Sequence, residues 1–322
     1  MKLVAFATGG TIASTRGDHG LAAALPGSGL TAGCGFDEVR EAFCLPSPEL
    51  SPADWLSLAR EMEGCPDADG FVVTHGTDTM TSAAATLAFL GAGGARPVVL
   101  TGAMKAPSEP GADGPTNLKD AELFARELAR RKIRGVFLAF GGSLLWGAGL
   151  VKRHWTRPDG FLTPACPALG RIEGGSARLN TEELASHSPR LDVPLPHALP
   201  SVFGIKIHPG LTSEALLAWL PLASGFVIES YGCGSGPIDG PCSIMPFLLQ
   251  AARAGKPVVN VTDAEDGVDL TRYRNGQIAA EAGMLSGRRM TFQAACARLS
   301  CLLARQADGP FASLWEESIC GE

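Results

Sequence analysis

The sequence predicts an α/β protein, with a larger doubly wound parallel-sheet domain at the N-terminus and a smaller α/β domain at the C-terminus. Three observations lead to this fold class. Short, continuously apolar runs alternate with segments of helical periodicity, which is typical of a parallel sheet covered by helices on both faces. Four prolines interrupt this alternation between residues 186 and 201, and it restarts beyond them. The length of 322 residues also exceeds what one hydrophobic core usually covers.

The elements of the first domain follow from local patterns. An apolar run at 3–7 predicts a buried strand that stops at the glycine pair 9–10. Ser51 at the N-cap and Pro52 at the first helical position predict a helix over 52–62. Further apolar runs and helical spacings predict strands at 70–76, 97–102 and 136–140, and helices at 79–90 and from 117 onward.

The second domain repeats the same alternation. Apolar runs predict strands at 202–207, 225–230 and 257–262, and helical spacing predicts helices at 212–220, 243–254 and 291–305. We therefore expect a first domain over 1–185, a proline-rich linker over 186–200 and a second domain over 201–322.

Composition and charge exclude several classes of function. Hydrophobic residues make up 45% of the chain and charged residues 19%, which is a globular composition and not that of a disordered chain. A net charge of −6 without a Lys/Arg run argues against nucleic acid or an anionic membrane as a partner. No stretch reaches 18 apolar residues, and the apolar run at the N-terminus is too short for a signal peptide. We therefore expect a cytoplasmic protein.

The nine cysteines are odd in number and include no C-x-x-C pair. This usage indicates the reduced thiols of a cytoplasmic protein and not a disulfide framework. No H-E-x-x-H motif or paired His/Cys ligand set occurs, so we expect no metal site.

Residues that suit acyl transfer gather where predicted strands end, and ligands of open parallel sheets bind at that edge. Thr11 follows the first strand, Thr77 and Asp78 follow the second, and Lys152 lies in the segment after the fourth. A threonine hydroxyl is a weak nucleophile that needs a proton acceptor within hydrogen-bond reach. Lys152 can accept the Thr77 proton, provided that burial favours its neutral form.

Each of these residues also has a purely structural interpretation. Thr11 could cap a tight turn, Asp78 could N-cap the following helix, and Lys152 could be a solvated surface side chain. His75, at the end of the second predicted strand, is expected to be a satisfied core histidine. The glycine-rich loop at 232–237 lacks the spacing of a nucleotide-binding motif, so we expect close backbone packing there, at a subunit contact or at the edge of an active site.

Taken together, these motifs resemble the bacterial L-asparaginases, in particular their cytosolic type I branch. The T-G-G-T-I-A and H-G-T-D-T motifs occur in the family's order, and the resemblance covers nearly the whole chain. The matching segments are 8–13, 46–50, 75–80, 101–104, 113–118, 151–152, 230–234 and 256–260.

The resemblance implies roles for individual residues. Thr11 would attack the side-chain amide of the substrate, and Thr77, Asp78 and Lys152 would form a second catalytic set. Ser47 and Asp78 would hold the α-amino and α-carboxylate groups. Further substrate contacts are implied for Gly10, Glu49, Gly76 and Ala103. The resemblance also implies a homodimer or homotetramer with its site between subunits, and no cofactor.

Three departures from the family pattern concern the substrate. The loop at 14–21 contains no Tyr close to the nucleophile, and Thr15 or His19 would have to assist instead. Pro48 stands where relatives carry a polar residue, and it offers neither a side-chain donor nor an N–H. Ser235 replaces an Asn. These departures indicate that the substrate preference need not be restricted to plain asparagine.

The sequence thus supports a small-molecule amidohydrolase, with L-asparagine as the first substrate. One alternative is a related hydrolase of glutamine, a D-amino-acid amide or an N-blocked asparagine. A second is a non-catalytic binding protein on the same scaffold, although a pure binder would not need the nucleophile. A dinucleotide-dependent oxidoreductase shares only the fold class, because the glycine fingerprint with a following acid is missing.

Overall fold

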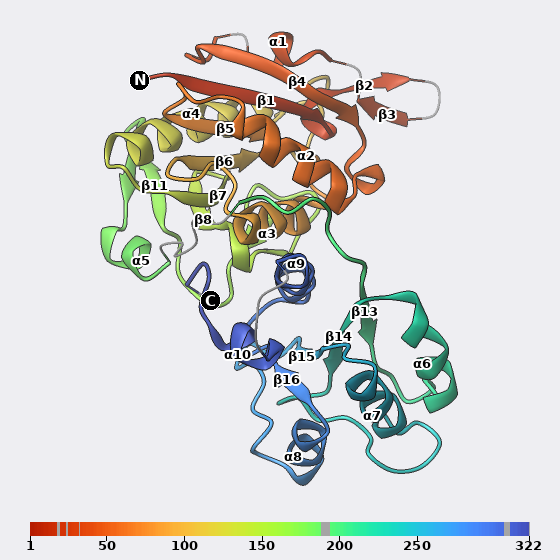
Figure 1. The fold of residues 1–322 in the computed structure, drawn as a ribbon. Helices are drawn as coiled ribbons and strands as arrows, with labels where there is room; N and C mark the ends of the chain where they lie inside the picture. Colours follow the sequence, from red (N-terminus) through yellow and green to blue (C-terminus); the bar gives the residue numbers. More distant parts are fainter. Residues whose placement is uncertain (18–19, 24, 32, 188–193, 306–309, 322) are drawn as a thin grey trace. The chain divides into compact units, whose positions relative to one another are not determined.

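The computed structural model describes residues 1–17, 20–23, 25–31, 33–187, 194–305 and 310–321, which form two compact units (Figure 1). The first unit comprises Met1–Leu195 together with Ile319–Gly321, and the second comprises Pro196–Ser318. Residues 188–193 of the expected linker lie outside the described residues. None of the described helices is long and apolar enough to cross a bilayer.

An eight-stranded sheet forms the centre of the first unit, in the order β12-β11-β8-β7-β6-β5-β1-β4. The pairs from β4 through β1, β5 and β6 to β7 are parallel, which confirms the predicted strands. The bounds are β1 Leu3–Gly9, β4 Glu38–Leu45, β5 Gly70–Thr74, β6 Pro97–Thr101, β7 Gly135–Phe140, β8 Ser143–Trp146, β11 Gly170–Glu173 and β12 Ser176–Leu179.

The sheet is mixed, because β8, β11 and β12 add to it in antiparallel fashion. Gly141 and Gly142, which follow the fourth predicted strand, make a tight hairpin turn into β8. Both have positive φ, 55° and 75°, as the two-residue turns of β-hairpins require. The edge strand β4 escapes prediction because its side chains are half-buried or exposed and it has no continuous apolar run.

Helices cover both faces of this sheet (Figure 1). The helices α2 (Pro52–Glu63) and α3 (Met80–Leu90) lie on one face, and α4 (Gly114–Arg130) lies on the other. The predicted N-cap Ser51 is confirmed, and the Asp54 carboxylate accepts its backbone N–H at 2.8 Å. Helix α4 begins three residues before the expected start at Asn117, because proline is tolerated in a first helical turn.

Short elements complete the first unit and shape the edge of the sheet. They are η1 Thr11–Ala13, β2 Ser14–Gly17, β3 Gly20–Ala23, α1 Gly27–Leu30, η2 Ser47–Glu49, η3 Gly147–Gly149, β9 Val151–Lys152, β10 Phe161–Leu162 and α5 Thr181–Ser186.

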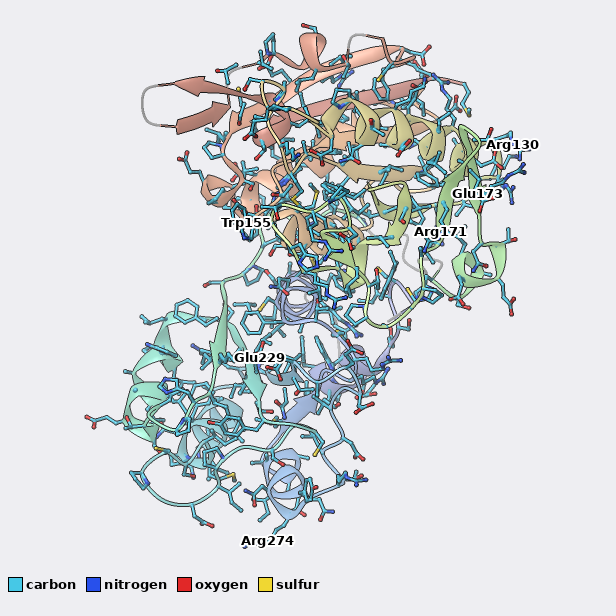
Figure 2. The ribbon with its side chains drawn as sticks, turned by 180° about the vertical axis from the view of Figure 1, so that it is seen from behind. Arg130, Trp155, Arg171, Glu173, Glu229 and Arg274 are labelled. Carbon is cyan, nitrogen blue, oxygen red and sulfur yellow. The ribbon has the colours of Figure 1, made fainter. Side chains whose placement is uncertain are left out.

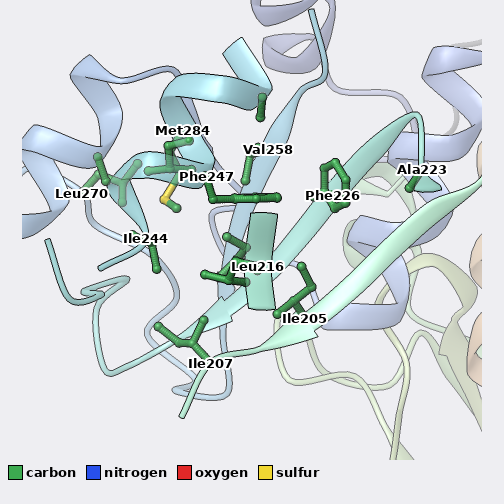
Figure 3. Packing of buried hydrophobic residues seen from close by; sticks show 14 residues of the cluster. Ile205, Ile207, Leu216, Ala223, Phe226, Ile244, Phe247, Val258, Leu270 and Met284 are labelled. Carbon is green, nitrogen blue, oxygen red and sulfur yellow. The ribbon is translucent and has the colours of Figure 1, made fainter. Parts of the chain in front are cut away.

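The second unit holds a four-stranded sheet in which every pair is parallel. Its core packs around Phe226 and Phe247, whose rings meet edge-on at 4.9 Å, with Leu216 beside them (Figure 3). The elements are β13 Val202–Lys206, α6 Ser213–Trp219, η4 Leu220–Leu222, β14 Gly225–Ser230, α7 Met245–Arg253, β15 Val258–Thr262, α8 Arg274–Glu281, β16 Met284–Ser286, α9 Phe292–Leu303 and α10 Phe311–Glu316.

The elements of the second unit confirm the three strands and three helices predicted there. Thr212 and Thr291 N-cap α6 and α9 through their hydroxyls, so each of these helices begins one residue after its predicted start. The short strand β16 and the helices α8 and α10 are additions, because their sequences are too short or too polar to show a period. Side chains of both units are drawn in Figure 2, where Glu229 marks β14 and Arg274 marks the start of α8.

The cysteines form no disulfide within the described part of the chain. Burial raises the pKa of the Cys296 and Cys301 thiols to about 12, so both stay protonated. Ile319 and Cys320 are buried in the first unit, where the Cys320 thiol donates to the carbonyl of Ala88 in α3 at 3.4 Å. The chain therefore returns to its first unit after completing the second.

Candidate active site

Two strand-end loops of the first unit meet backbone to backbone. Gly10 follows β1 with a φ of 80°, and its N–H donates to the carbonyl of Leu45 at 3.2 Å. A Cβ atom added to Gly10 would lie only 2.3 Å from the Cα atom of Gly76, which follows β5. Only glycine fits at position 10, and the two loops pack without a side chain between them.

A third segment, η2, lies against this contact. The Ser47 hydroxyl oxygen accepts the Asp78 N–H at 3.3 Å, and the Thr79 hydroxyl donates to the Ser47 carbonyl at 2.8 Å. A Cβ atom on Gly76 would lie 2.6 Å from the Ser47 Cβ atom. The η2 segment therefore lies directly on the loop that follows β5.

These three segments enclose a pocket of about 180 Å³. It brings together six of the residues that the sequence predicts for the site, and Ser14, Pro46 and Pro48 complete the lining. The lining residues are Gly10, Thr11, Ser14, Pro46, Ser47, Pro48, Gly76, Thr77 and Asp78. Sequence reasoning does not assign Ser14 or Pro46 to the lining, although both flank predicted site residues.

Lys152 joins the loop after β5 from β9. Its Nζ atom donates to the Thr77 hydroxyl oxygen at 2.9 Å and to the Asp78 carboxylate at 2.6 Å. The Lys152 side chain is 20% exposed and that of Asp78 is 64% exposed, while Thr77 is buried. Lys152 is therefore not a solvated surface side chain, and the hydroxyl, the carboxylate and the ammonium group form one hydrogen-bonded set.

The expectation that Asp78 could N-cap the next helix is wrong. Thr79 occupies the N-cap of α3 and makes no side-chain cap bond, and the Asp78 carboxylate accepts a hydrogen bond from Lys152. Thr11 does not cap η1 through its side chain either, and its half-buried hydroxyl lines the pocket.

Two predicted substrate contacts lie away from the pocket lining. Glu49 is exposed at the end of η2, and Ala103 is buried against Ile12. Of the two residues expected to assist the nucleophile, Thr15 is exposed on β2, and His19 lies outside the described residues. No three metal-ligating side chains cluster in the described ranges.

Two side chains hold the loop after β6. They are Asp113, at the N-cap of α4, and Asn117, within α4, and the sequence assigns neither of them a role. The Asp113 carboxylate accepts the N–H groups of Met104 and Lys105 at 2.9–3.1 Å. The Asn117 amide donates to the Gly102 carbonyl at 2.9 Å and accepts the Gly141 N–H at 3.1 Å. Buried Asn117 thus ties the loops after β6 and β7 together.

Residues 2–185 match the family model of the asparaginase N-terminal domain, and residues 201–310 match that of the glutaminase/asparaginase C-terminal domain. The L-asparaginase of Thermococcus kodakarensis is 34% identical over 336 residues, covering 100% of this chain and 99% of the relative. L-asparaginase 1 of Escherichia coli is 32% identical over 267 residues, covering 81% of this chain and 77% of the relative.

Two solved structures are similar over the full chain. The thermostable L-asparaginase from Thermococcus kodakarensis superposes with a TM-score of 0.84 at 31% identity, covering 100% of this chain and 99% of the other. L-asparaginase I from Vibrio cholerae superposes with a TM-score of 0.82 at 26% identity, covering 100% of this chain and 98% of the other.

Replacing Gly76 by Ala is expected to displace Ser47, because the new Cβ atom would lie 2.6 Å from that side chain. We expect the free energy of unfolding to fall by about 1–3 kcal/mol, the usual cost of overpacking. Calorimetry measures this as a lower melting temperature. Gly29→Ala is the matched control, since a Cβ atom there meets nothing closer than 3.9 Å. An unchanged melting temperature for Gly76→Ala would contradict the contact.

Proposed function

The chain belongs to the asparaginase family, and we propose that it hydrolyses the side-chain amide of L-asparagine to L-aspartate and ammonia through an acyl-enzyme on Thr11. One observation carries this proposal. Thr11 lines the same pocket as Thr77 and Asp78, and both of these are hydrogen-bonded to Lys152. A nucleophile beside groups that move protons is the arrangement that acyl transfer needs.

The reaction begins when the Thr11 hydroxyl oxygen bonds to the amide carbon. As the carbon–nitrogen bond then breaks, the proton lost by Thr11 passes to the departing nitrogen. Lys152 donates to the Thr77 oxygen, which leaves the Thr77 hydrogen free to point into the pocket. The set of Thr77, Asp78 and Lys152 is thus suited to carry a proton to the departing nitrogen, which leaves as ammonia. Water then attacks the Thr11 ester, releasing aspartate and restoring the hydroxyl.

Backbone amides are suited to stabilise the oxyanion of each tetrahedral intermediate. The N–H groups of Thr11 and Thr77 have no acceptor among the described residues, and both residues line the pocket. Preorganised donors of this kind act without reorganisation when the charge develops.

The α-groups of a free amino acid find complementary partners in the same pocket. The Ser47 oxygen already accepts the Asp78 N–H, so its own hydrogen can be donated to the α-carboxylate. The exposed Asp78 carboxylate can accept from the α-amino group. We keep a related small-amide hydrolase as the second candidate, because Pro46 and Pro48 contribute no side-chain donor to this rim.

Four further proposals concern the branch of the family, the cellular location, the oligomeric state and the cofactor requirement. We propose that the chain belongs to the type I branch, which the names of the relatives from Escherichia coli and Vibrio cholerae support. A cytoplasmic location and a homo-oligomer follow from that resemblance. We also propose that the enzyme works without a cofactor, with Thr11, Thr77, Asp78 and Lys152 as its chemical groups.

Thr11→Ala is expected to lower the rate of ammonia release from L-asparagine by about a thousandfold or more, because it removes the atom that forms the covalent bond. Thr156→Ala, which removes an exposed hydroxyl after β9, should keep the wild-type rate. Retention of more than about a tenth of the wild-type rate by Thr11→Ala would remove Thr11 from this role.

Discrimination among substrates is expected to be modest. The loop at 14–21 has no Tyr to donate to the nucleophile, and one lost hydrogen bond to a developing charge costs roughly tenfold to a hundredfold in rate. We expect kcat/KM for L-asparagine below about 10⁶ M⁻¹s⁻¹. The measurement is a kcat/KM panel over L- and D-asparagine, L-glutamine and N-blocked asparagine. A preference for L-asparagine above about a thousandfold, with kcat/KM above about 10⁶ M⁻¹s⁻¹, would show that the missing Tyr and the prolines of the rim do not affect substrate selection.

Light scattering is expected to give a mass at least twice the 33.4 kDa of one chain. The reason is the family resemblance, which implies a site completed at a subunit boundary. A monomer at working concentration that nevertheless turns over L-asparagine would refute this proposal.

A further inference from the structure

A buried chain of hydrogen bonds runs from α2 to the loop after β5. The Trp55 indole Nε1–H group donates to His75 Nε2 at 3.2 Å, and His75 Nδ1 lies 2.8 Å from the Gly76 carbonyl oxygen. Trp55 is 4% exposed and His75 is 1% exposed. His75 is therefore the satisfied core histidine that the sequence predicts.

These two partners leave the imidazole only one possible tautomer. An indole nitrogen can only donate, so Nε2 must carry the lone pair, and a carbonyl can only accept, so Nδ1 must carry the proton. Burial lowers the pKa of His75 to about 4, which keeps the ring neutral near pH 7. Trp55 therefore selects the tautomer in which His75 donates to Gly76.

The carbonyl that His75 binds belongs to the same peptide group as the Thr77 N–H. The chain has no cis peptide bond among its described residues, so this carbonyl and this N–H point in opposite directions. Gly76 and Thr77 line the pocket, whereas the His75 ring lies in the interior. A carbonyl turned toward the ring therefore turns the Thr77 N–H toward the pocket.

Among the described residues, the His75 ring is the only hydrogen-bond partner of this peptide group. The sheet fixes the peptide group between Thr74 and His75, two before this one, because the His75 N–H donates to the Thr101 carbonyl at 2.8 Å. Gly76 has no side chain to restrict rotation of its peptide group. The imidazole thus restrains the orientation of the peptide group between Gly76 and Thr77, which the hydrogen bonds of the sheet do not restrain.

We propose that His75, oriented by Trp55, is a positioning residue that holds the Thr77 N–H ready to donate to the oxyanion of the reaction. The role in the reaction rests on the proposed function, whereas the orientation of the peptide group does not. Because the oxyanion exists only in the intermediates and their transition states, loss of this orientation should lower kcat and leave KM nearly unchanged.

Two double variants separate positioning from general stability. Trp55→Phe with His75→Asn keeps a side-chain N–H near the position of Nδ1, and Trp55→Phe with His75→Leu removes it. Both lack the bond between residues 55 and 75, and Asn and Leu are similar in size. We expect kcat of the Leu variant to be about tenfold to a hundredfold below that of the Asn variant, with KM within about threefold, as for weakening one oxyanion donor.

If the Leu variant fails to fold, His75→Gln in the same background replaces it, because the longer amide reaches the position of Nε2 and not that of Nδ1. Equal kcat values for the Asn and donor-lacking variants, or a difference confined to KM, would overturn the proposal. A purely structural role would lower the melting temperature of both variants without separating their kcat values.

A second readout does not depend on activity. Selective ¹⁵N-threonine labelling reports the Thr77 amide by NMR, assigned through Thr77→Ser. We expect its signal to shift or split in the donor-lacking variant and to stay near the wild-type position in the Asn variant. An unmoved signal would overturn the proposal. If wild-type protein released no ammonia from L-asparagine, the proposed function would fail, and this spectrum would still decide the role of His75.

Discussion

The contact between the backbones of Gly10 and Gly76 is the constraint on which the rest of the site depends. Strands β1 and β5 are parallel neighbours paired as far as Ala7 and Thr74, so the residues that follow them meet at the same edge. Because no Cβ atom separates the two glycines, the loops approach closely enough for Thr11 and Thr77 to share one pocket. Ser47 then packs on Gly76 and closes the third side. A site of this size needs glycine in two of its three walls.

Much of the pocket could be predicted from the sequence, because most of its residues directly follow predicted strands. Apolar runs locate β1 and β5, and parallel neighbours place Thr11, Thr77 and Asp78 at one edge. The position of Lys152 is harder to predict. The chain first turns back through β8 and η3 before β9 brings the lysine to a partner 74 residues earlier. Such a path has no local signal in the sequence. The edge strands β4 and β12, and β11 beside β12, lack such a signal too, because partly exposed strands show no continuous apolar run.

The errors in prediction have a common physical cause. Asp78 has the residue type and the position of an N-cap, yet its carboxylate binds Lys152, which a local pattern cannot reveal. For the same reason, the sequence does not reveal which backbone groups Asp113, Asn117 and His75 bind. Each holds the backbone of a strand-end loop through a contact that only the folded sheet creates. Their hydrogen bonds fix the loops in advance, which is the condition for a site whose donors are peptide groups.

The return of Ile319–Gly321 to the first unit has a consequence for biosynthesis. Domains usually fold in order as they leave the ribosome. Here the carbonyl of Ala88 in α3 receives its thiol partner from a residue 232 positions later, after every strand of the second unit has been translated. The first unit can form its sheet early, but its packing around α3 stays incomplete until translation has passed residue 321. A ribosome stalled within the second unit would therefore hold a first unit that has the loops of its pocket and still lacks part of its core.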